Sequence, residues 1–130
     1  FFLGCNMDHG GTKEFVPTPV IDRCFSRHRK DYEHLSSTPD AFDAFVGAVS
    51  EMMRTQPNYS ADDLAKIRVP VTIVQSENDE FIKPEHAEYL ARSIPGAELA
   101  ILPGVSHFAP LQRPDMFNDA VLTFVGKVFS

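Results

Sequence analysis

Two stretches of the chain decide its fold: residues 69–83 read VPVTIVQSENDEFIK, and residues 94–108 read IPGAELAILPGVSHF. Each begins with or contains an apolar run that passes into turn-forming or polar residues, which is typical of a buried strand that ends in a loop. Between them, the apolar residues from Pro84 to Ile94 recur at helical spacing and predict a helix. A strand, a helix and a second strand in this order predict a parallel sheet with a crossover connection.

The rest of the chain extends this pattern in both directions. Residues 1–5 form a short apolar run that fits a strand buried on both faces, and Pro114 opens a last amphipathic segment. Residues 14–65 are too long for a simple crossover and contain two further amphipathic segments. We therefore expect an α/β fold with three parallel strands, in which residues 1–13 and 66–130 form the core and residues 14–65 form a helical cap.

Composition and charge exclude several classes of protein. The chain has 130 residues, with 12 Lys and Arg against 18 Asp and Glu, for a net charge of −6. An acidic balance argues against a nucleic-acid partner, and no apolar run reaches the ~18 residues that would span a membrane. Cys5 and Cys24 show no zinc or redox spacing, and they suit a reducing, cytoplasmic location. Nothing in the sequence implies a metal or an organic cofactor.

Polar side chains follow each predicted strand at its carboxyl end, the edge of a parallel sheet where functional sites gather. Asp79 follows the second strand and His107 follows the third. A carboxylate beside a histidine fixes the tautomer of the ring and stabilises the imidazolium, as a general base requires. Asp79 and His107 are therefore the candidate catalytic pair. Asp8, after the first strand, is the rival acid, with turn formation as its alternative role.

The remaining histidines carry no such pattern, and their spacing forms no metal site. We expect them at the surface or on helices: His9, His28, His34 and His86.

The two stretches that decide the fold resemble the carboxyl half of the α/β-hydrolases. Residues 69–82 are similar to the strand and loop that bear the acid in that family, and residues 94–108 are similar to its final strand and histidine loop. The resemblance implies a hydrolase that acts on an ester, amide or related bond of a small-molecule substrate. It also implies that Asp79 is the acid and His107 the histidine of a catalytic triad.

The nucleophile of such a triad is not among these residues. In this fold the serine precedes the acid and sits in a G-x-S-x-G elbow, which the chain does not contain. Ser76 and Ser106 lie in no elbow, so we expect neither to be the nucleophile. The upstream nucleophile could be serine, aspartate or cysteine.

These observations predict the C-terminal part of a longer hydrolase that is inactive alone. We expect it to associate with its missing amino-terminal half or with another copy of itself. The alternative is a non-catalytic protein that binds a ligand or a partner on the same fold.

Overall fold

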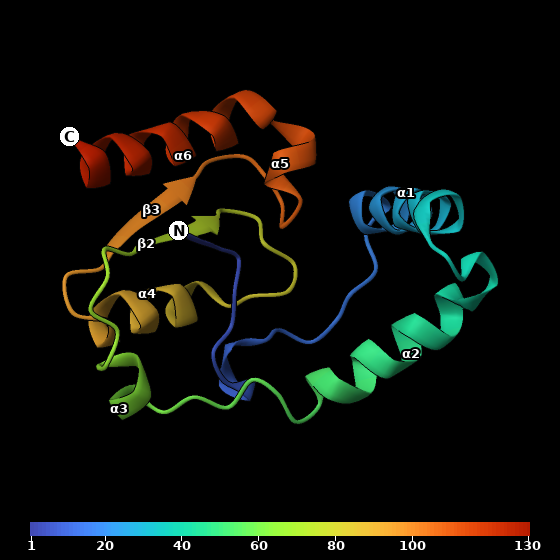
Figure 1. The fold of residues 1–130 in the computed structure, drawn as a ribbon, viewed down its shortest axis with the longest axis horizontal. Coiled ribbons are helices and arrows are strands. Elements are labelled where there is room, and N and C mark those ends of the chain that lie inside the picture. The colour runs from blue at the N-terminus through green and yellow to red at the C-terminus, as the bar shows by residue number, and fades with distance from the viewer. The chain divides into compact units, whose positions relative to one another are not determined.

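The computed structural model describes residues 1–130 and divides into two compact units (Figure 1). The first unit comprises Phe1–Phe15 and Asn58–Ser130, and the second comprises Val16–Pro57. This division differs from the predicted cap boundary at residues 14–65, because the segment from Asn58 onward belongs to the first unit. That segment includes the short helix α3 (Ala61–Leu64), whose Leu64 is buried in the core of the first unit.

The first unit is built on a parallel sheet in the order β1 (Phe2–Leu3), β2 (Thr72–Ser76) and β3 (Glu98–Leu102). This architecture confirms the predicted α/β fold with three parallel strands. The first strand is shorter than the predicted run of residues 1–5, because Gly4 has a φ of +50° and turns the chain out of extended geometry. The carboxyl ends of the strands share one edge of the sheet, where their loops begin.

Helices cover both faces of this sheet. Figure 1 shows α4 (Pro84–Ser93) on one side and α6 (Pro114–Phe129) on the other. Successive side chains of β2 point to opposite faces, so Ile73 joins the core cluster of α4 while Val74 joins the cluster on the α6 side. Short helical segments follow β1 and β3: η1 (His9–Gly11) and α5 (Ala109–Gln112).

The second unit consists of two helices, α1 (Pro19–Leu35) and α2 (Phe42–Met53), joined through the short 3-10 turn η2 (Pro39–Ala41). Thr18 caps α1, because its side-chain oxygen accepts the N–H of Ile21 at 3.2 Å. Tyr32 stacks on Phe45 with ring centroids 5.4 Å apart, which packs the two helices together. No helix of either unit combines the length and the apolar character needed to cross a membrane.

Candidate active site

The loops after β2 and β3 bring Asp79 and His107 into direct contact. Nδ1 of His107 lies 3.1 Å from Oδ1 and 3.0 Å from Oδ2 of Asp79. The Asp79 side chain is 1% exposed, whereas 30% of the His107 side chain is exposed. Nδ1 carries a proton and donates it in the hydrogen bond to Asp79. The neutral ring therefore has its lone pair on Nε2, where it can accept a proton.

Two backbone groups hold the Asp79 carboxylate from its own loop. Oδ1 accepts the N–H groups of Phe81 and Ile82, each at 2.9 Å. Burial raises the pKa of Asp79, but the hydrogen bond and charge of His107, together with these two N–H groups, outweigh burial and leave the pKa below its ordinary value. The carboxyl group is therefore ionised at neutral pH and able to orient His107.

Backbone hydrogen bonds join the loop of the acid to the loop of the histidine. The N–H of Glu77 donates to the carbonyl of Leu102 at 2.9 Å, and the N–H of Asn78 donates to that of Val105 at 3.0 Å. The two loops therefore continue the pairing of β2 with β3 beyond the end of the strands, which keeps Asp79 and His107 opposite each other.

Gly4 lies against the pair from the end of β1, a contact that the sequence did not reveal. A Cβ atom at this position would lie 2.9 Å from Oδ2 of Asp79 and 3.0 Å from Nδ1 of His107. The φ of +50° is also a conformation that side-chain-bearing residues rarely adopt. Glycine is therefore required for β1 to end so close to the carboxylate. The only signal in the sequence was a glycine that closes an apolar run.

Asp8 is engaged elsewhere. It caps η1, and its Oδ1 accepts the N–H of Gly10 at 2.7 Å. Of the two carboxylates considered as the acid, only that of Asp79 is hydrogen-bonded to the His107 ring.

His86 lies on α4, but it is buried with a relative exposure of 6%, in contrast to the other three histidines outside the pair. Its Nε2 accepts the N–H of Met7 at 3.0 Å. Burial lowers the pKa of His86; the charge of Asp8 raises it and that of Lys83 lowers it further, and the net result is a pKa below the ordinary value. The neutral ring therefore serves as a hydrogen-bond acceptor inside the fold.

Ser76 and Ser106 are buried and contact neither ring nitrogen of His107 by a hydrogen bond. The Oγ of Ser76 makes no hydrogen bond, and that of Ser106 accepts the N–H of Phe108 at 3.3 Å. Neither hydroxyl is arranged as a nucleophile activated by His107.

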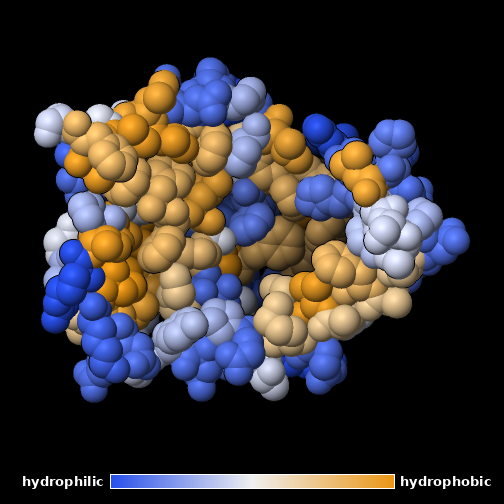
Figure 2. Space-filling view, viewed as in Figure 1, coloured by the Kyte–Doolittle hydropathy of each residue, from blue (hydrophilic) through white to orange (hydrophobic).

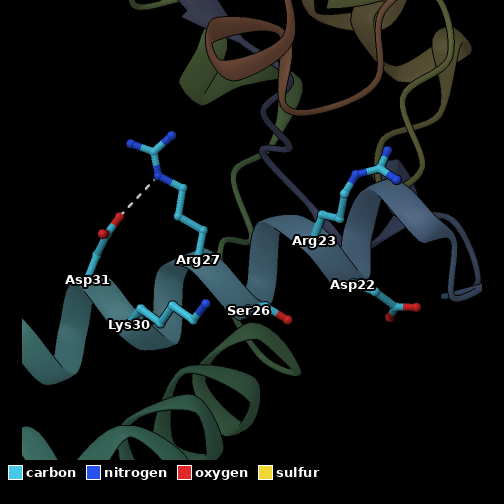
Figure 3. A pocket seen from close by; sticks show the side chains of 6 residues that line it. All are labelled: Asp22, Arg23, Ser26, Arg27, Lys30 and Asp31. Carbon is cyan, nitrogen blue, oxygen red and sulfur yellow. Dashed lines mark hydrogen bonds and ion pairs between the residues drawn. The ribbon is translucent and has the colours of Figure 1, made fainter.

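A hollow along α1 has a different chemistry (Figure 3). Its charged and polar lining is exposed, and Arg27 is hydrogen-bonded to Asp31 across 3.4 Å. It contains no histidine: its lining residues are Asp22, Arg23, Ser26, Arg27, Lys30 and Asp31. No group of three or more His, Cys, Asp or Glu side chains is arranged to hold a metal ion.

One protein-family match covers both loops that carry Asp79 and His107. The model of the Alpha/beta hydrolase family matches residues 9–120. The 2-hydroxy-6-oxononadienedioate/2-hydroxy-6-oxononatrienedioate hydrolase of Klebsiella pneumoniae is 30% identical over 94 residues, which cover 72% of this chain and 32% of that protein. The polyketide synthase ThaQ of Burkholderia thailandensis is 39% identical over 64 residues, which cover 49% of this chain and 3% of that protein. The chain thus spans about a third of the length of the Klebsiella hydrolase and only a small part of the length of ThaQ.

Solved structures show the same fold. The serine hydrolase CarC, involved in carbazole degradation, superposes with a TM-score of 0.62 at 21% identity over 90% of this chain and 43% of its own. The serine hydrolase CCSP0084 from Cycloclasticus zankles gives a TM-score of 0.52 at 26% identity over 56% of this chain and 26% of its own.

Proposed function

The chain belongs to the alpha/beta hydrolase family, and from this premise we propose that it carries the acid and the histidine of a catalytic triad. The reaction proposed is hydrolysis of an ester, amide or related bond by acyl transfer. The observation that supports it best is the 3.0 Å contact between Nδ1 of the half-buried His107 and Oδ2 of the buried Asp79. The contact lies where neighbouring parallel strands end, which is where this class of fold places its active sites.

In this proposal, His107 moves the proton at each step. Its Nε2 takes the proton of a hydroxyl nucleophile as the oxygen attacks the acyl carbon, and it then gives that proton to the leaving group. A water molecule is deprotonated in the same way, attacks the acyl-enzyme and releases the acid, and the proton returns to the nucleophile. Asp79 holds the ring in the required tautomer and stabilises the imidazolium formed at each stage.

The nucleophile in this proposal lies outside residues 1–130, in an elbow of the form Gly-x-Ser-x-Gly. A glycine or alanine in place of that serine would instead favour a non-catalytic binding protein. Reading the sequence upstream of Phe1 separates these two outcomes.

The test is a comparison of variants in the complete polypeptide that contains these residues. The substrates are short p-nitrophenyl esters and 2-hydroxy-6-oxononadienedioate, the compound for which the Klebsiella relative is named. Replacing His107 with alanine should abolish the chemical step, a loss on the order of 10⁶-fold in kcat, because the proton then has no acceptor. His34→Ala, an exposed position on α1, is the control and should leave kcat unchanged.

The same assay decides between the two carboxylates. Asp79→Asn should lower kcat by about 10⁴-fold, because an amide favours the wrong histidine tautomer, while Asp8→Asn should change it far less. If Asp8→Asn is the more damaging change, or if His107→Ala is fully active, the assignment of roles is wrong.

A further inference from the structure

Two glutamates of the acid loop hold the histidine loop by its backbone. Oε2 of Glu77 accepts the N–H of Gly104 at 2.7 Å, and Oε2 of Glu80 accepts the N–H of His107 at 3.0 Å. Glu80 directly follows Asp79 in the chain. One dipeptide therefore contacts His107 twice, through its ring and through its backbone.

The backbone contact has a specific mechanical consequence. His107 lies in the irregular segment between β3 and α5, where no helix or strand fixes the main chain. The residue before it is anchored by the N–H of Ser106, which donates to Oε1 of Gln112 at 2.7 Å. The N–H of His107 itself donates a hydrogen bond to Glu80 and to no backbone carbonyl of the loop.

We propose that Glu80 is a positioning residue of the site, whose carboxylate fixes the backbone of His107 so that Nδ1 faces Asp79. In this proposal Glu80 acts as a hydrogen-bond acceptor of the right length, so a neutral acceptor of the same length should replace it. The effect on turnover rests on the function proposed above, but the effect on the ring does not. Neighbouring residues of the loop are held separately, Val105 by Asn78 and Ser106 by Gln112, so Glu80 fixes His107 itself. A displacement of about 1 Å in a catalytic group can cost on the order of 10²-fold in rate, so the loss of this one hydrogen bond is enough to matter.

Two substitutions separate reach from charge. Glu80→Gln keeps the length of the side chain and one acceptor oxygen but removes the charge. Glu80→Asp keeps the charge but is one carbon shorter, so its carboxylate falls short of the His107 N–H. In the complete polypeptide we expect Glu80→Gln to retain kcat within about threefold. We expect Glu80→Asp to lower kcat by about 10- to 100-fold while KM changes little.

Glu88 supplies the matched control. It is exposed on α4 and pairs with Arg92, and it makes no contact with either loop of the site. Glu88→Gln and Glu88→Asp repeat the same two chemical changes and should leave kcat unchanged.

A second measurement reports on the ring without any turnover. Proton NMR follows the Nδ1–H of His107 in the hydrogen bond to Asp79, and amide exchange follows its backbone N–H. Both signals should be preserved in Glu80→Gln and should weaken or exchange faster in Glu80→Asp. If the two variants differ in these signals as expected but the wild-type protein shows no turnover, the positioning role is supported and the proposed function is contradicted. Unchanged signals in Glu80→Asp, or equal damage in both variants, would overturn the positioning role.

Discussion

Gly4 is the point at which the backbone of β1 meets the Asp79–His107 pair, and the space left for it is smaller than a methyl group. An added Cβ would stand 2.9 Å from a carboxylate oxygen and 3.0 Å from a ring nitrogen, both of them in a buried or half-buried site. The contact joins three segments, since each of the three residues follows a different strand. The end of β1 therefore contributes to the geometry of the pair without contributing a side chain.

We predict that Gly4→Ala lowers the free energy of unfolding by about 1–3 kcal/mol, because it combines a left-handed backbone conformation with a steric contact. It should also displace the His107 ring, visible as a change in the Nδ1–H signal. Gly47→Ala is the control: it lies within α2, and a Cβ there would meet nothing within 4 Å. That change should leave stability equal or raise it by up to ~1 kcal/mol. Urea unfolding measures both, and equal midpoints for wild type and Gly4→Ala would contradict the close approach.

The residues of the site differ in how far the sequence could predict them. Asp79 and His107 were predictable as neighbours because a strand, a helix and a strand place their loops on one edge of the sheet. The role of Gly4 was not predictable, because it depends on the distance between β1 and loops that are remote in the chain. Glu80 was visible only as a polar loop residue, because a hydrogen bond to a backbone N–H leaves no pattern in the sequence.

At the scale of elements, local signals predicted the helices better than the strand ends or the unit boundary. Pro84 and Pro114 each mark the first residue of a helix, since proline favours that position and its effect is local. The end of β1 at Leu3 depends on the conformation of Gly4, and the place of residues 58–65 in the first unit depends on the burial of Leu64. Both are tertiary effects.

Helix α4 is linked to the segment after β1 by His86, whose ring accepts the N–H of Met7. Gly11 also fits closely there, because a Cβ at its position would lie 2.6 Å from the His86 ring. A protonated ring has no lone pair for the Met7 N–H. The link between α4 and this segment therefore depends on His86 remaining neutral.

This dependence predicts a loss of stability in mild acid. The pKa of His86 is lowered in the folded chain from an ordinary value of 6.5, so the unfolded state binds more protons in the window below about 6.5. Stability therefore rises with pH across that window. The contribution of neutral His86 to the free energy of unfolding is complete above about pH 6.5, and it is lost as the pH falls through the pKa of His86 in the folded state. The pKa of Asp79 is also lowered in the folded chain, so this group too makes stability rise with pH, but only in the pH range below its ordinary pKa of 3.8.

Urea unfolding at a series of pH values tests the role of His86. The free energy of unfolding of the wild type should fall between about pH 7 and pH 5. His86→Gln should flatten that part of the curve, while the exposed His34→Gln should keep the slope of the wild type. An unchanged slope in His86→Gln would assign the effect to another group.

At the scale of the whole molecule, the chain leaves sizeable apolar side chains uncovered. Figure 2 shows apolar surface over the region where Figure 1 places β3 and α6. The exposed apolar residues of these two elements are Leu99, Ile101, Leu122, Val125 and Phe129. β1 also pairs on one side only, with β2.

Association of the chain with an amino-terminal half or with a second copy stays a prediction. Sedimentation of the 130-residue chain is the measurement that checks it.

The last prediction is that residues 1–130 alone do not hydrolyse p-nitrophenyl esters through the Asp79–His107 pair. Neither Ser76 nor Ser106 is arranged as a nucleophile, and the thiol of Cys5 is unsuitable as well. Ser76 is buried without a hydrogen bond to His107, and the hydroxyl of Ser106 accepts the N–H of Phe108. Burial raises the pKa of Cys5 to about 11, so its thiol stays protonated at neutral pH and is a poor nucleophile.

Steady-state assays of the purified 130-residue chain, beside the complete polypeptide, give the measurement. We expect turnover by the complete polypeptide and none above background by the 130-residue chain, because His107 has no nucleophile there to deprotonate. Turnover by the 130-residue chain that disappears in both Ser106→Ala and His107→Ala would show instead that Ser106 leaves its contact with Phe108 and acts as the nucleophile. In that case the acid, the base and the nucleophile would all lie within these residues, and the loop from Gly104 to Phe108 would have to rearrange during catalysis.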